Sequence, residues 1–203
     1  MLHAAIALAD REGIAAVSMR KLAQELGVEA MSLYNHVANK NELLDGMVDA
    51  VAGEIAVPAG DADWKTAIRT IAISSYETLL RHQWAGSLWM RQMPGPARLR
   101  HFDAVLGSLR DAGFSEDLTF HAYHILQSFV LGYTLQVLTY RALALEDLEE
   151  TAAGFIQQLS ADEYPHFAEH VRQHMEPGVR DESAFQLGLD LILDGLERLR
   201  VVQ

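Results

Sequence analysis

The segment from Ser18 to Lys40 constrains the fold of this chain more than any other stretch of the sequence. Its first half carries four apolar residues at helical spacing: Met19, Leu22, Ala23 and Leu26. This spacing predicts one apolar stripe on a short helix. Gly27 readily adopts positive φ, so it predicts a tight turn that ends this helix, with Val28 filling the turn. Leu33 and Val37 give a second short helix its own apolar side, and the whole segment predicts a helix-turn-helix.

The second of these helices leaves a polar face uncovered, with Tyr34 near its edge. The residues of this face are Glu29, Ala30, Ser32, Asn35 and His36. Such a face is short and polar enough to enter the major groove of DNA. Ala30 and Met31 offer only apolar contacts, for example to a thymine methyl group, whereas Ser32 and Asn35 can form hydrogen bonds. A solvated face on a small helical bundle is the alternative reading of the same residues.

A wider set of residues matches the pattern of a known family. They are Ile6, Ala7, Gly13, Ser18, Met19, Arg20, Leu22, Ala23, Leu26, Gly27, Val28, Leu33, Tyr34, His36, Val37, Lys40, Leu43 and Leu44. Through them the first quarter of the chain resembles the tetracycline-repressor (TetR) family of dimeric, ligand-responsive transcriptional regulators. The stretch from Trp64 to Ala142 resembles more loosely the C-terminal half of the tetracycline repressor.

The resemblance implies DNA-binding roles for two groups of residues. The positions where the family contacts phosphates are Ser18, Arg20, Tyr34 and Lys40. The positions on or beside the base-reading helix are Ala30, Met31, Ser32, Asn35 and His36. Family members usually carry a basic arm ahead of the first helix, whereas this chain begins within that helix. The resemblance thus implies a repressor, not an enzyme, that binds a palindromic operator as a homodimer and is released by a small molecule.

The charge of the chain has to be read where the DNA contact would be. The net charge of −12 argues against a nucleic-acid partner when it is taken globally. Residues 18–40 contain three basic and two acidic residues, a net charge of +1: Arg20, Lys21 and Lys40, and Glu25 and Glu29. The local charge therefore permits DNA binding but predicts only a weak electrostatic contribution to it.

Composition also limits the chemistry and the compartment. The chain has no cysteine, which excludes disulfides and thiolate metal sites and fits a reducing cytosol. The first apolar run is short, lacks a basic flank and is followed by charged residues, so it predicts an amphipathic helix rather than a signal peptide. No stretch is long and apolar enough to span a membrane. We therefore expect a cytoplasmic protein.

The pattern along the chain predicts an all-α fold in two domains. The first, residues 1–53, is a three-helix helix-turn-helix unit for DNA binding. Asn39 and Glu42 form a capping pair that predicts a helix through Ile55, and residues 57–61 form the linker. Residues 60–203 are helical throughout and form the ligand-binding and dimerisation domain. Two helices there, 123–141 and 181–200, carry more apolar surface than one chain covers, which predicts a four-helix bundle with a second copy.

Aromatic and polar residues of the second domain are candidates for an effector cavity. They are Trp84, Trp89, Phe102, Phe120, His124 and Gln127. Their composition predicts a mainly apolar or aromatic ligand, although each residue alone is equally explained by an ordinary core. By the resemblance, tetracycline binders place a metal-ligating histidine where this chain reads LWMRQMP at 88–94, and a glutamate where it has Gln136. The magnesium–drug site is not carried over, and we expect no cofactor and no metal.

Two further functions remain open on the sequence alone. A metal-dependent hydrolase would use the histidine clusters at positions 166, 170 and 174 or 121 and 124, which share helix faces. No glycine-rich phosphate loop, nucleophile elbow or HExxH motif supports it. A helix-turn-helix used only for protein contacts is the other option, and the outward Ser18, Arg20, Tyr34 and Lys40 argue against it.

Overall fold

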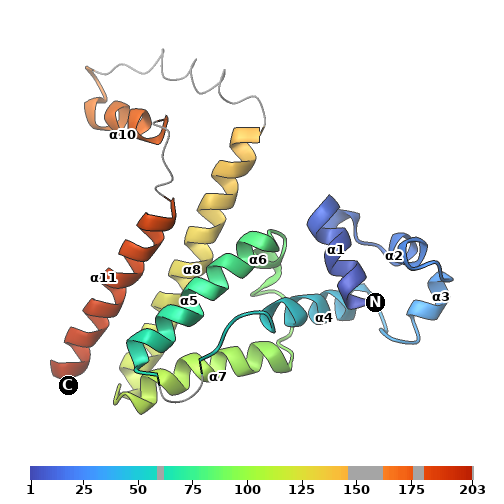
Figure 1. Cartoon of the computed structure of the whole chain (residues 1–203), viewed down its shortest axis with the longest axis horizontal. Helices are drawn as coiled ribbons and strands as arrows, with labels where there is room; N and C mark the ends of the chain where they lie inside the picture. The colour runs from blue at the N-terminus through green and yellow to red at the C-terminus, as the bar shows by residue number, and fades with distance from the viewer. Residues whose placement is uncertain (59–61, 146–161, 176–180, 203) are drawn as a thin grey trace.

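Helices supply the regular secondary structure of this protein. The computed structural model describes residues 1–58, 62–145, 162–175 and 181–202, and within these ranges no strand occurs. Figure 1 shows a small group of helices at the N-terminal end beside a larger and longer bundle. The predicted all-α fold is confirmed. None of the helices in the described ranges is long and apolar enough to cross a membrane.

The helices follow one another in two groups. The N-terminal group comprises α1 (Leu2–Glu12), the 3₁₀ turn η1 (Ile14–Ala16), α2 (Met19–Leu26), α3 (Ala30–Leu33) and α4 (Lys40–Ala52). The larger group comprises α5 (Trp64–Arg81), α6 (Ala85–Leu88), α7 (Pro96–Asp111), α8 (Glu116–Leu145), α10 (Pro165–Met175) and α11 (Asp181–Val202).

Helices α2 and α3 form the predicted helix-turn-helix. The hydroxyl of Ser18 accepts a hydrogen bond from the backbone N–H of Lys21 and so caps α2. Gly27 ends α2 with a φ of 66°, the left-handed conformation that glycine adopts without strain. The prediction that Val28 fills the turn is wrong, since its side chain is 46% exposed. The physical reason is that α3 is a single turn, too short to enclose the loop that precedes it.

Helix α4 connects the two groups, because it packs against α1 on one side and α7 on the other. The side chain of Asn39 accepts a hydrogen bond from the N–H of Glu42 and caps α4 as predicted. The Glu42 carboxylate returns to the N–H of Ala38, however, rather than to that of Asn39. The helix ends at Ala52, earlier than the predicted Ile55, and four of its residues are completely buried: Leu43, Met47, Val48 and Val51.

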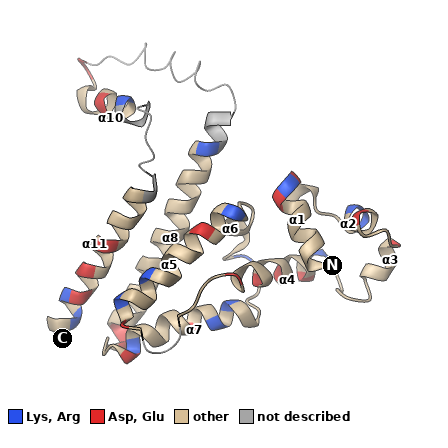
Figure 2. Cartoon of the chain, in the orientation of Figure 1, with Lys and Arg blue, Asp and Glu red and all other residues tan. Residues whose placement is uncertain are grey.

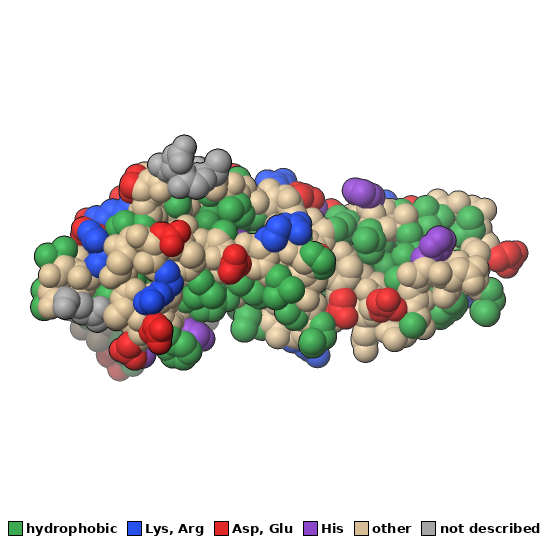
Figure 3. Space-filling view, turned by 90° about the horizontal axis from the view of Figure 1, so that it is seen from below, with side chains coloured by type: hydrophobic (Ala, Val, Ile, Leu, Met, Phe, Trp, Pro, Cys, Tyr) green, Lys and Arg blue, Asp and Glu red, His purple; other side chains and the backbone are tan. Residues whose placement is uncertain are grey.

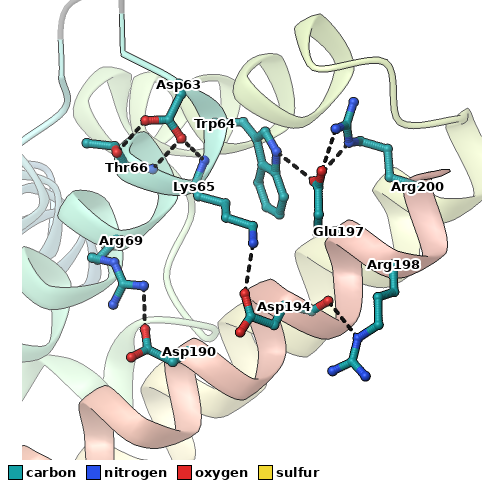
Figure 4. Close-up of polar contacts among 10 residues, drawn as sticks. All are labelled: Asp63, Trp64, Lys65, Thr66, Arg69, Asp190, Asp194, Glu197, Arg198 and Arg200. Carbon is teal, nitrogen blue, oxygen red and sulfur yellow. Dashed lines mark hydrogen bonds and ion pairs between the residues drawn. The ribbon is translucent and has the colours of Figure 1, made fainter.

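The larger bundle is built on α5, α7 and α8, with α11 packed against α8. Tyr76 of α5 stacks on Phe185 of α11 at a centroid distance of 4.3 Å. Polar contacts along the outer edge join α11 to α5 (Figure 4): Lys65 pairs with Asp194 at 2.8 Å, Arg69 pairs with Asp190, and the indole N–H of Trp64 donates to Glu197. Helix α11 is thereby fixed along one side of α5.

The opposite sides of α8 and α11 expose apolar residues. Those with more than two-fifths of their surface open include Phe120, Ile125 and Leu135 on α8 and Leu187, Leu191 and Leu199 on α11. Figure 3, a view from below, shows further hydrophobic side chains at the surface, interspersed with polar and charged ones. The exposed apolar side chains of α8 and α11 have no cover within the described part of the chain.

Candidate DNA-binding surface and effector cavity

The predicted DNA-contacting residues lie together at the helix-turn-helix end of the molecule. Seven of them are exposed: Ser18, Arg20, Met31, Tyr34, Asn35, His36 and Lys40. Tyr34 is 44% exposed, whereas Ala30 and Ser32 are partly buried. The Ser32 hydroxyl donates to the backbone oxygen of Glu29 at 2.6 Å, so its proton is engaged in the first turn of α3. Ser32 can still accept a hydrogen bond from a base.

Ion pairs decide which positive charges of this end are free. Arg11 pairs with Glu25 at 2.7 Å, and Lys21 pairs with Glu12. Figure 2 accordingly shows basic and acidic residues close together on α1 and α2 rather than a continuous basic surface. Arg20 and Lys40 have no ion-pair partner among the described residues. These two cations are therefore available for phosphates.

A small cavity of about 50 Å³, partly open to solvent, lies between α5, α7 and α8. Its lining residues are Ile68, Ile71, Ala72, Ser75, Leu79, Trp89, His101, Val105, Tyr123, Leu126, Gln127, Val130 and Leu131. None of them carries a formal charge at neutral pH, because burial lowers the pKa of His101 and keeps its ring neutral. The lining is mostly apolar with a few polar groups, which is the composition typical of small-molecule sites.

The structure brings together only some of the residues predicted for the cavity. Trp89 and Gln127 line it, and Phe102 is half-buried beside it with its ring edge-on to Tyr123 at 6.2 Å. Phe120 and His124 are exposed on α8, with ring centroids 4.4 Å apart. Trp84 is buried elsewhere, where its indole N–H donates to Asp10 of α1 at 2.7 Å.

The sequence prediction missed His101, whose imidazole is the most unusual group of the cavity wall. Burial lowers the pKa of His101 to about 4, so the ring is neutral at physiological pH. Its Nδ1 atom is buried and has no hydrogen-bond partner among the described residues. Burial also raises the pKa of the nearby Tyr123 hydroxyl. The helical spacing of the sequence could have revealed this residue, because His101 lies on the same buried side of α7 as Val105 and Leu109.

We expect the buried imidazole of His101 to make the protein sensitive to mild acid. Its pKa is about 4 in the folded chain and near 6.5 when unfolded. The unfolded chain binds the proton between these values, so stability is lost as the pH falls through this window. The contribution at pH 5 is about 2 kcal/mol relative to pH 7. Urea unfolding at both pH values should show a smaller loss for His101→Phe than for the wild type, and equal losses would contradict the assignment.

A second polar cluster joins the two groups of helices. His82, at the end of α5, places Nδ1 2.9 Å from the Asp10 carboxylate and Nε2 3.2 Å from Glu54. Arg81 donates to the same Glu54 oxygen at 3.1 Å. Together with Trp84 these contacts hold the end of α1 against α5 and α6. They explain why Trp84 is absent from the cavity.

Comparison with known proteins places these features in one family. The family pattern described as "Bacterial regulatory proteins, tetR family" matches residues 1–47. The pattern described as "Tetracyclin repressor-like, C-terminal domain" matches residues 57–200, which is more than half of the chain. The chain belongs to the TetR family.

Relatives of this TetR-family protein include repressors of known action. It is 32% identical to the HTH-type transcriptional repressor DrrR1 of Streptomyces coeruleorubidus, over 98% of this chain and 76% of the relative. It is 30% identical to the class A tetracycline repressor protein from transposon 1721 of Escherichia coli, over 100% of this chain and 91% of the relative. The protein is a ligand-responsive transcriptional repressor, as the family resemblance predicted.

Solved structures of the same family share the fold over almost the whole chain. A possible TetR-family regulator from Streptomyces coelicolor A3(2) superposes with a TM-score of 0.78 at 28% identity, covering 98% of this chain and 97% of its own. ActR of Streptomyces coelicolor, in complex with actinorhodin, gives a TM-score of 0.79 at 27% identity, covering 98% and 95%.

The rival hydrolase reading gains no support for this TetR-family protein. Members of the family are regulators rather than enzymes. Within the described residues no three histidine, cysteine or acidic side chains come close enough to hold a metal ion. His121 and His124 are exposed, as are His166 and His170 of α10. The side chain of His174 lies outside the described part of the chain.

Proposed function

We propose that this repressor binds a palindromic operator as a homodimer and leaves it when an uncharged effector fills the cavity between α5, α7 and α8. Residues 1–53 form the DNA-binding domain, and residues 60–203 form the ligand-binding and dimerisation domain. The observation that carries the proposal is the pairing of an exposed helix-turn-helix, which keeps two free cations, with an apolar cavity. The operator is intracellular DNA, so the site of action is the cytoplasm.

DNA contacts divide into two kinds in this proposal. Phosphate contacts come from Ser18, Arg20, Tyr34 and Lys40, and contacts to bases come from Ala30, Met31, Ser32, Asn35 and His36. The phosphate contacts fix position, whereas the base contacts give specificity. Two such units in a dimer would present α3 to successive major grooves about 34–36 Å apart.

Replacing Lys40 with alanine should weaken binding to all DNA sequences alike. The side chain has no ion-pair partner among the described residues, so its charge is free to displace a counterion from the DNA. The slope of log K against log salt should flatten by about one unit. Fluorescence anisotropy over a salt series measures both quantities.

Two variants serve as controls for the Lys40 experiment. Arg100→Ala removes an exposed positive charge from α7, outside the proposed DNA surface, and should leave the salt slope unchanged. Asn35→Ala should relax the preference for the operator over other DNA, because it removes a side chain that reads bases. An unchanged affinity and slope for Lys40→Ala would show that the assigned docking is wrong.

The effector in this proposal is uncharged, mainly aromatic and able to form one or two hydrogen bonds. A charged ligand would lose its hydration in a cavity whose lining offers no opposite charge. Trp89 and Gln127 are retained from the sequence prediction, Phe102 supports the wall, and His101 and Tyr123 are added. Trp84, Phe120 and His124 are not part of this proposed site. The actinorhodin complex of ActR supports an aromatic ligand for a similar fold.

Thermal-shift measurements test the effector class directly. Simple hydroxyanthraquinones are suitable first probes, with benzoate and benzylamine as charged comparators. A compound of the proposed class should raise the melting temperature of the wild type and do so less for Val130→Phe, which fills the cavity. Stabilisation only by charged compounds would contradict the proposed class.

The homodimer would use the exposed apolar sides of α8 and α11. Their exposed side chains include Phe120, Leu135, Leu187 and Leu191, and a second copy would cover them in a symmetric four-helix bundle. Light scattering at micromolar concentration should give a dimer, and a monomer would refute this part of the proposal.

A further inference from the structure

Helix α7 receives its N-terminal cap from another helix. Its own N-cap residue is Gly95, which has no side chain to accept hydrogen bonds from the first turn. The Asp49 carboxylate of α4 takes that role: it accepts from the N–H of Ala97 at 3.1 Å and from the N–H of Arg98 at 2.9 Å. Two of the donors that a helix start leaves unsatisfied are thus satisfied by α4.

The Asp49 carboxylate approaches the backbone of Gly95 so closely that no side chain fits at position 95. A Cβ atom at position 95 would lie 2.4 Å from the carboxyl carbon of Asp49. The backbone at Gly95 is extended, so the requirement for glycine comes from this close approach and not from its φ angle. Asp45, one turn earlier on α4, accepts from the N–H of Met93 at 3.2 Å. Helix α4 therefore holds the loop before α7 as well as its first turn.

Arg98 joins the loop held by α4 into one hydrogen-bonded unit. Its side chain is 1% exposed, and its guanidinium donates to the backbone oxygens of Trp89 at 2.9 Å and Gln92 at 3.1 Å, and to that of Met93. Trp89 belongs to the cavity wall, and its ring lies edge-on to His101 at 5.8 Å. The unit from Trp89 to Arg98 therefore touches the cavity at one end and Asp49 at the other.

We propose that Asp49 is the positioning residue that transmits occupancy of the cavity to the DNA-binding domain, an inference that rests on the proposed function. A ligand that displaces Trp89 or His101 moves the unit that Arg98 holds together. The cap by Asp49 passes this displacement to α4, whose N-terminal end carries the helix-turn-helix. The tilt of α4 then sets the separation of the two α3 helices in the dimer.

The distance between the two DNA-binding domains tests this role without an identified ligand. The chain has no cysteine, so Gln24→Cys at an exposed position of α2 gives one spin label per protomer. Pulsed electron–electron double resonance then measures the single distance between the two labels of the dimer. Val130→Phe, which fills the cavity, serves as the probe in place of an effector. We expect it to shift the mean distance when Asp49 is present, and this shift to be lost in Asp49→Ala.

Controls separate transmission from a general loss of structure. Asp45→Ala removes the neighbouring carboxylate and a single hydrogen bond, and should retain most of the shift. Asp49→Asn keeps one acceptor oxygen and should restore part of it, which a merely destabilised helix start would not predict. Melting temperatures of all variants show whether each is folded.

The outcomes distinguish this inference from the proposed function. Equal shifts with and without Asp49, or no shift in either background, would overturn the role of Asp49 while dimerisation and operator binding stay intact. A labelled wild type that shows no inter-label distance and binds no DNA would refute the proposed function, and the role of Asp49 with it.

Discussion

Arg98→Ala should lower the free energy of unfolding by about 3–5 kcal/mol. The guanidinium of Arg98 donates to three backbone oxygens of the loop before α7, those of Trp89, Gln92 and Met93. Truncation would leave buried acceptors without partners and open a cavity beside them, and both effects destabilise. Urea unfolding followed by circular dichroism measures the loss.

Variants at and near this position show whether geometry or charge is responsible. Arg98→Lys keeps the positive charge but lacks the planar fork that reaches several carbonyls at once, so an intermediate loss is expected. Arg100→Ala, two residues later on the exposed side of α7, should change stability by less than about 0.5 kcal/mol. A loss below about 1 kcal/mol for Arg98→Ala would mean that the loop does not depend on this residue.

Leu191→Asp should raise the dissociation constant of the proposed dimer by at least about 100-fold, which is about 2.8 kcal/mol. Leu191 is 64% exposed in a single chain and lies on the side of α11 away from the buried Leu189 and Leu193. A symmetric interface would bury the new carboxylate twice, close to its own copy. Burial of unpaired charges costs several kcal/mol, so the estimate is a lower bound.

Sedimentation velocity over a concentration series measures this effect. The matched control is Leu99→Asp, which makes the same change at a 53% exposed leucine of α7, outside the proposed interface. It should leave the dimer intact. If the two variants behave alike, α11 does not form the interface, and the apolar surface of α8 and α11 has another partner.

The helix-turn-helix could be predicted from sequence because its determinants are local. Leu22, Ala23, Leu33 and Val37 are all buried, as their spacing requires, and Gly27 has the expected positive φ. The same pattern could not reveal that the second helix would be one turn long. After Leu33 the backbone continues in hydrogen-bonded turns instead of a regular helix. The spacing from Leu33 to Val37 buries both side chains in either case, so the apolar pattern could not distinguish the two.

The cavity was less predictable, because the sequence does not show which residues an aromatic side chain contacts in the folded protein. Trp84 was counted among the ligand-binding candidates, yet its N–H finds an acceptor in Asp10, which is 74 residues away in the sequence. Arg98 and His101 occupy the buried stripe of α7, where a pattern search expects apolar side chains. Only tertiary structure shows that the first is bonded to a loop and that the second lines a cavity.

The cap that Asp49 supplies to α7 limits how freely DNA-binding domains can be exchanged within the family. A chimaera joined in the linker keeps both halves of the covalent chain but separates Asp49 from Gly95, and Asp10 from Trp84. A donor domain with a different residue at position 49 would leave the first turn of α7 without its acceptor. A chimaera that keeps these contacts must therefore transfer both partners of each pair together.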